Sequence, residues 1–133
     1  MKDKERKTTP RMAVGKLGED AACAYLEQQG HSIIDRNCRR GHLEIDIVSV
    51  DREGIHFIEV KSRVAPVSAR PEENVTRTKQ DRIARAALRY LHTSKDPRLH
   101  ADMEVSFDVV AVTFDKDDTI VDWFPNAWIP LYV

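Results

Sequence analysis

Two apolar segments on either side of a short polar turn constrain the fold of this chain more than any other feature. "HLEIDIVSV" (residues 42–50) and "IHFIEVKS" (residues 55–62) flank "DREG" (residues 51–54). Alternating apolar and polar residues are typical of β-strands, and Asp and Gly are typical of the turn between two of them. The three segments therefore predict an antiparallel hairpin.

The register of this hairpin follows from the turn. Aligned on it, Ile47 lies opposite Ile58 and Ile45 lies opposite Val60, so one face is apolar throughout. A slip by one residue would mix apolar and charged side chains on both faces, which burial opposes. We therefore expect this register.

The same register gathers charges on the other face. Asp46 lies opposite Glu59, and Glu44 lies opposite Lys61. Opposed β-carbons are only about 4.5–5.5 Å apart, so two carboxylates there repel unless a positive charge lies between them. Mg²⁺ suits such oxygen ligands. The alternative is a surface salt-bridge ladder, which pairs Glu44 with Lys61 but leaves the two acids unexplained.

The rest of the chain completes an α/β domain. We expect helices over residues 11–29 and from Thr76 or Thr78 onward, and further strands at "HSIIDRN" (31–37), "VSFDVVAV" (105–112) and "TIVDWF" (119–124). The order αβββαβ(β) predicts a mixed sheet flanked by helices. Residues 1–10 are expected to be a flexible tail and residues 11–133 a single domain.

Two polar residues lie close to the apolar sides of the predicted helices. Glu19 is at the edge of the first apolar arc, beside Leu26, from where it can reach the sheet; a half-exposed helix glutamate is the alternative. Gln80 lies within the second stripe, three residues before Ile83, and a buried amide there needs a partner. Lys79 flanks the same buried side.

Composition restricts the class of protein. The chain has 133 residues, 41% of them hydrophobic and 32% charged, which is typical of one globular domain. Its apolar runs are too short for a membrane span and its start lacks a signal-peptide core, so a cytoplasmic location is expected. Cys23 and Cys38 belong to no CxxC or Cys/His cluster, so free thiols are expected and zinc is not.

Charge is unevenly distributed although the formal net charge is only −1. From residue 96 onward there are two basic and eight acidic residues, which leaves 19 basic and 14 acidic residues in the first 95. A basic portion beside an acidic one weakly favours a surface for a polyanion.

Three short motifs in fixed order carry a resemblance. "EID" (residues 44–46), "EVK" (59–61) and "TKQ" (78–80) resemble the PD-(D/E)XK nuclease superfamily. More specifically, the chain resembles the YraN-like family of uncharacterised bacterial proteins, related in fold to Holliday-junction resolvases, over about residues 14–128. Two positions depart from the pattern: Leu43 stands where a glycine is usual, and Ser106 where an arginine is common.

The resemblance implies a restriction-endonuclease-like fold and a structure-directed endonuclease acting on DNA with Mg²⁺ or Mn²⁺. It implies that Asp46, Glu59 and a backbone carbonyl beside Glu59 hold the metal, with Glu19 binding it through water or completing a second metal site. Lys61 would be the catalytic lysine. Gln80 would orient water or the scissile phosphate.

Candidate phosphate contacts are the basic residues around these motifs: Arg39, Arg40, Arg63, Arg77 and Lys79. His42 shares the strand face of the acids and is expected to be a bystander. Besides a nuclease, two interpretations stay open. One is a nucleic-acid-binding module that does not cut, and the other is a protein-interaction scaffold that retains the fold. Sequence does not fix the oligomeric state, although a homodimer would suit a branched substrate.

Overall fold

The computed structural model describes residues 10–41, 43–67, 75–100 and 102–130, and within these ranges it is a five-stranded sheet with two helices. The predicted order αβββαβ(β) and the flanked mixed sheet are confirmed, an arrangement consistent with a nuclease-like fold. Most of the predicted tail (residues 1–9) lies outside the described residues. The elements are α1 (Pro10–Gln28), β1 (Ser32–Arg40), β2 (Leu43–Val50), β3 (Gly54–Val64), α2 (Arg77–Thr93), β4 (Glu104–Asp115) and β5 (Asp118–Phe124).

The strands lie in the order in which they occur in the chain. Neighbouring strands are antiparallel except β3 and β4, which are parallel from Gly54↔Glu104 to Val64↔Phe114. Parallel neighbours need a crossover, and α2 lies within the segment that makes it. The sheet is therefore mixed because one helix separates its third and fourth strands.

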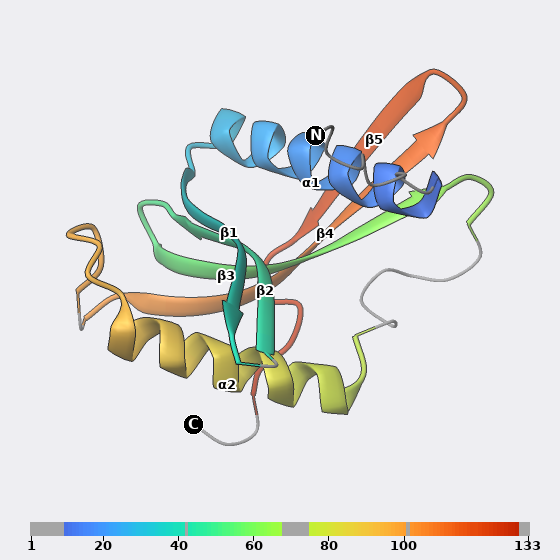
Figure 1. Ribbon diagram of the computed structural model, residues 1–133. Helices are drawn as coiled ribbons and strands as arrows, with labels where there is room; N and C mark the ends of the chain where they lie inside the picture. Colours follow the sequence, from blue (N-terminus) through green and yellow to red (C-terminus); the bar gives the residue numbers. More distant parts are fainter. Residues whose placement is uncertain (1–9, 42, 68–74, 101, 131–133) are drawn as a thin grey trace, which may run out of the picture.

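The two helices cover opposite faces of the sheet (Figure 1). α1 packs Ala22, Cys23 and Leu26 on a core cluster that includes Ile47 and Ile58. The α2 side forms the second cluster, whose buried members include Cys38, Ile45, Val48, Ile55, Phe57, Ile83, Ala87, Tyr90 and Val109. Cys23 and Cys38 are buried on different sides of the sheet, and neither forms a disulfide among the described residues.

The helix boundaries follow local signals. Thr76 caps α2, its side chain accepting a hydrogen bond from the Lys79 backbone N–H, so Thr76 rather than Thr78 marks the start. Leu17 and Leu91 are 57% and 37% exposed, whereas Leu26 of α1 and Ile83 and Tyr90 of α2 are buried in the core clusters. Neither helix, within the described ranges, is both long and apolar enough to cross a membrane.

The predicted hairpin register is confirmed close to the turn. Val50 pairs with Ile55 and Ile47 with Ile58, but the regular pairing of β2 with β3 ends there. The expectation of one continuous apolar face is wrong beyond this point. Ile45 packs in the α2-side cluster, whereas Val60 packs beside the α1-side cluster.

The cause is a fork in the sheet. β2 stays paired with β1 as far as Leu43↔Arg40, while β3 stays paired with β4. In Figure 1 the teal pair β1 and β2 runs toward α2, and β3 continues beside β4. Asn37 has a φ of 49°, which asparagine tolerates better than most residues, and in the β1–β2 register it falls level with Asp46. The unusual backbone conformation of Asn37 therefore lies at the level where β2 separates from β3.

Gly18 marks the closest approach of α1 to β3. A β-carbon built at Gly18 would lie 1.7 Å from Ser62 Oγ and 2.7 Å from Ser62 Cβ, whereas one at Gly15 meets nothing within 4 Å. We expect Gly18→Ala to destabilise the fold by about 1–3 kcal/mol through overpacking. Gly15→Ala should stabilise it by up to about 1 kcal/mol through helix propensity.

Urea unfolding of the two variants tests this prediction. Combining Gly18→Ala with Ser62→Gly should recover part of the loss, because it removes both atoms that the new methyl group meets. Equal stability of the two alanine variants would show that α1 does not pack on β3 at this distance.

Candidate functional site

The fork opens a polar cavity of about 590 Å³ between α1, β2, β3 and the start of α2. Its lining includes Glu19, Asp46, Glu59, Lys61 and Lys79. These side chains come from four elements, so tertiary packing and not sequence proximity brings them together. Three of them are acids and two are lysines, so opposite charges lie together in this cavity.

Asp46 accepts a hydrogen bond from a backbone N–H of β3 that no longer faces a main-chain partner on β2. Its Oδ2 accepts the Val60 backbone N–H at 2.8 Å, so the carboxylate replaces a main-chain partner at the fork. Burial, followed by the charge of Glu59, raises the pKa of Asp46 to about 7. Asp46 therefore sits where a second negative charge is costly, which is the condition that a bound cation relieves.

Glu59 is nearly buried, with 9% of its surface exposed, and a lysine neutralises it. Lys79 Nζ lies 2.7 Å from Glu59 Oε1. Burial alone would lower the pKa of Lys79, but the hydrogen bond and the charge of Glu59, together with Lys61 and Asp46, outweigh it and the pKa is raised. Lys79, predicted as a phosphate contact, is thus a direct partner of the acid.

Lys61 is the second lysine of the cavity. Burial and its hydrogen bond with Lys79 lower the pKa of Lys61 below the ordinary lysine value. The neighbouring ammonium disfavours a second positive charge, so Lys61 gives up its proton more readily than a free lysine. The Glu44–Lys61 salt bridge of the ladder interpretation does not occur among the described ion pairs, where Glu44 lies 4.0 Å from Arg39.

Glu19, on α1, is partly buried and lines the same cavity. Its side chain is 19% exposed, and its Oε1 lies 3.7 Å from Arg36, which also binds Asp20 at 2.7 Å. Arg36 was not identified from the sequence. It lies on β1, next to Asn37, and its contacts with Glu19 and Asp20 hold α1 close to the sheet.

A second cavity of about 460 Å³ opens on the α2 side of the fork. Asp46, Glu59 and Lys79 line both cavities, and the second one adds Glu44 and Arg82. The two carboxylates are therefore accessible from both sides of the divided sheet.

The other predicted residues lie in several places. Gln80 donates its amide to the Val75 carbonyl at 3.0 Å, which supplies the partner that its position demanded, and its role at a site stays a prediction. Arg39 and Arg77 are exposed and Arg63 is partly buried. The side chain of Arg40 and the whole of His42 lie outside the described residues.

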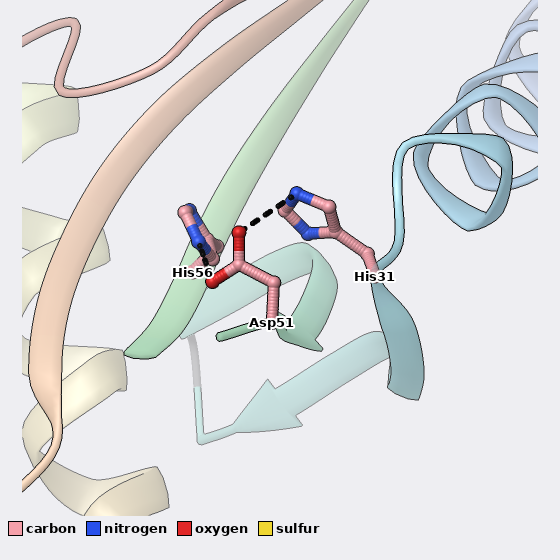
Figure 2. Close-up of side chains that lie close together, drawn as sticks. All are labelled: His31, Asp51 and His56. Carbon is pink, nitrogen blue, oxygen red and sulfur yellow. Dashed lines mark hydrogen bonds and ion pairs between the residues drawn. The ribbon is translucent and has the colours of Figure 1, made fainter. Parts of the chain in front are cut away.

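A buried polar cluster on the α1 face of the sheet was not anticipated (Figure 2). His56, on β3, lies between Asp108 Oδ2 at 2.7 Å and Asp51 Oδ1 at 2.9 Å. His31, just after α1, is 2.8 Å from Ser49 Oγ. Burial would lower the pKa of His56, but Asp108 and Asp51 outweigh it and raise that pKa.

The sequence held a signal for this cluster. Alternation along β3 already placed His56 on the face of Ile58, and Asp108 lies within the apolar strand "VSFDVVAV". A buried carboxylate needs partners, and Asp108 has them: it accepts from Trp123 Nε1 at 2.9 Å and from the Asn126 backbone N–H at 3.0 Å. Ser106, at the position where an arginine was expected, also donates to Asp108.

The raised pKa of Asp46 predicts how stability depends on pH. Between about pH 4 and pH 7 the folded state keeps a proton on Asp46 that the unfolded state has released, so the free energy of unfolding falls as pH rises. With metal-free protein, we expect Asp46→Asn and wild type to have similar stability near pH 4. By pH 8 the variant should be the more stable, by up to about 4 kcal/mol.

Urea unfolding in EDTA across this pH range measures the difference between the two proteins. His56, whose pKa is also raised, contributes equally to both and cancels. A stability difference between the two proteins that does not change with pH would mean that folding does not raise the pKa of Asp46.

Comparison with known proteins places these residues in a family. The model of the uncharacterised protein family UPF0102 matches residues 18–112, which contain Glu19, Asp46, Glu59, Lys61 and Lys79. A UPF0102 protein of Bacteroides thetaiotaomicron is 38% identical over 117 residues, which cover 88% of this chain and 93% of that protein. A UPF0102 protein of Trichlorobacter lovleyi is 42% identical over 87% of this chain and 90% of its own length.

Other matches are less complete. A UPF0102 protein of Oleidesulfovibrio alaskensis is 46% identical over 77% of this chain, and the match spans about half (48%) of that protein. Among solved structures, Pyrococcus furiosus SfsA in complex with Ca²⁺ aligns over 85% of this chain and 62% of its own, with 15% identity and a TM-score of 0.34, too low to support an argument. The family match and the curated relatives show that the chain belongs to the uncharacterised protein family UPF0102.

Proposed function

We propose that this protein is a Mg²⁺-dependent, structure-directed endonuclease acting on DNA, with its site at the fork between β2 and β3. The observation that carries the proposal is the convergence of Asp46, Glu59, Glu19 and Lys61 on one open cavity. Two carboxylates and a lysine at a solvent-accessible position form a set of groups suited to phosphodiester hydrolysis.

The donor set fits a hard divalent cation. Asp46 and Glu59 offer carboxylate oxygens, the ligands that Mg²⁺ and Mn²⁺ take in proteins, and Glu19 offers a third acid. Asp46 is destabilised by burial and by Glu59 when no cation is present. We assign Asp46 and Glu59 as ligands and Glu19 as a ligand or as the acceptor for a metal-bound water. Bound there, Mg²⁺ would polarise the phosphate and offset its developing negative charge.

Lys61 is assigned the role of positioning and activating the attacking water. Its lowered pKa leaves a larger fraction of its amine unprotonated than in an ordinary lysine, and Lys79 beside it is the cause after burial. Either protonation state serves the reaction: the free amine accepts a proton from water, and the ammonium stabilises negative charge at the phosphate.

DNA contacts would come from basic residues near the fork. Arg39, on β1, and Arg77, at the start of α2, are exposed, Arg63 lies two residues after Lys61 on β3, and Arg82 lines the second cavity. Such residues hold the phosphate backbone without reading sequence, which suits recognition by structure. Arg40 is assigned the same role from its position in the sequence, and Gln80 that of orienting water or phosphate.

A second candidate is a nucleic-acid-binding module that does not cut. The observation that favours it is the Lys79–Glu59 ion pair, because a lysine 2.7 Å from the carboxylate occupies one of the positions that a metal needs. In a nuclease Lys79 must move from Glu59 to a phosphate when metal and DNA bind. In a binding module the ion pair would persist.

Lys61→Met separates catalysis from structure. We expect the variant to keep its fold, its response to Mg²⁺ and its affinity for DNA within a few-fold, while cleavage falls by roughly 100-fold or more. Single-turnover assays on labelled branched, flapped, nicked, single-stranded and duplex substrates measure this.

The matched control is Lys16→Met, since Lys16 is a 77% exposed lysine on the outer side of α1. It should cleave like wild type. Absence of cleavage by wild type on every substrate, with binding that weakens as salt rises, would support the binding module instead. No binding to any of these nucleic acids would leave the interaction scaffold.

Metal binding is tested without cleavage. Mg²⁺ or Mn²⁺ at about ten times its Kd should stabilise wild type by about 1.4 kcal/mol, a rise of several degrees in melting temperature. Asp46→Asn should abolish the rise because it removes a ligand charge. Asp102→Asn, which changes an exposed acid before β4, should keep it. An equal rise in both variants would exclude this cavity as the metal site.

A further inference from the structure

We propose that His31, Asp51 and His56 form a second metal site, for Zn²⁺ or a similar transition-metal ion, separate from the cavity at the fork. The three side chains come from the end of α1, the β2–β3 turn and β3, and point toward one another (Figure 2). The site contains no cysteine, so the cysteine pattern of the sequence gave no indication of it.

The spacing of the donor atoms suits a four-coordinate ion. His31 Nε2 lies 3.4 Å from Asp51 Oδ2, His56 Nε2 lies 2.9 Å from Asp51 Oδ1, and the donor atoms all lie within 4.8 Å of one another. Zinc bonds of about 2.0–2.1 Å at tetrahedral angles place ligand atoms about 3.3 Å apart. The separations to Asp51 already bracket that value.

Both imidazole rings are held in the orientation that metal binding requires. The Nδ1 atom of His56 is paired with Asp108 Oδ2 at 2.7 Å, and the Nδ1 atom of His31 with Ser49 Oγ at 2.8 Å. Metal-bound histidines usually donate the other ring N–H to a carboxylate or another acceptor, which fixes the tautomer and points the free nitrogen at the ion. Here both Nε2 atoms point at the same carboxylate.

His31 Nε2 gives the strongest indication of a ligand. The His31 side chain is fully buried, and among the described residues this nitrogen makes no hydrogen bond, although Asp51 Oδ2 lies 3.4 Å away. A buried ring nitrogen without a hydrogen bond is costly, and an ion held between it and Asp51 would remove the cost. Two nitrogen donors and one oxygen donor select Zn²⁺, Co²⁺ or Ni²⁺ over Mg²⁺, which prefers oxygen.

The site has access to solvent. A cavity of about 480 Å³, lined by Gln29, Gly30, Asp51, Arg52 and Glu53, reaches Asp51 from outside. Through Asp51 it provides an entry path for an ion. The bound ion would tie the end of α1 to the hairpin that carries Asp46 and Glu59, so its expected role is structural.

The test uses full-length protein stripped with EDTA. Zn²⁺ titration by calorimetry and the visible spectrum of the Co²⁺-loaded protein should show one site per chain, with the intense absorption of a tetrahedral nitrogen- and oxygen-ligated ion. Zn²⁺ should also raise the melting temperature. His31→Gln should weaken binding by at least about 100-fold, and Ser49→Ala, which removes only the anchor of His31, by roughly tenfold.

The control separates this site from the fork. Asp46→Asn combined with Glu59→Gln should keep the Co²⁺ spectrum and the Zn²⁺ affinity, while losing any Mg²⁺ response. Wild type that binds no Zn²⁺ or Co²⁺ would overturn the proposal whatever the fate of the variants. Zn²⁺ binding that disappears in the Asp46/Glu59 variant and survives His31→Gln would overturn it as well, by assigning the ion to the fork.

Discussion

The hydrogen bond from the Val60 backbone N–H to Asp46 Oδ2 is the interaction on which the candidate site depends. Where β2 turns away from β3, the main chain of β3 loses a ladder partner, and a buried N–H without a partner is costly. A side chain from the departing strand supplies it. The carboxylate is thereby fixed at the point of divergence, next to Glu59, and it is held there at the expense of its own ionisation.

The remaining charges of the site follow from that constraint. Two buried acids cannot both be ionised without a counter-charge, and Lys79 from α2 provides one by binding Glu59. Lys79 in turn disfavours the charge on Lys61, which lies beside it. The site is thus a group of coupled charges in which, after burial, Glu59 raises the pKa of Asp46 and Lys79 lowers that of Lys61.

Near the turn, at the opposite end of the hairpin, buried carboxylates are paired with a histidine instead of a lysine. His56 is enclosed by two carboxylates, and Asp108 is itself bound by Trp123 and Asn126. One β-strand, β3, therefore carries a buried histidine network on the α1 face and an acid–lysine site at the fork, separated by Phe57 and Ile58 of the core. The turn between β2 and β3 contributes Asp51 to the histidine network. It also sets the register of the two strands that carry the acids at the fork.

The sequence by itself determined the element order, the hairpin register near its turn and the acids at its open end, because alternation and turn chemistry are local properties. It also indicated Glu19 from its place on the helix. Only the tertiary structure decided that the hairpin divides at Ile47 and Ile58, that Ile45 joins the α2 side, and that Lys79 binds Glu59. The partners of His31 and His56 were decided there too, because buried polar groups take their partners from segments far apart in the chain, and no local pattern records those distances.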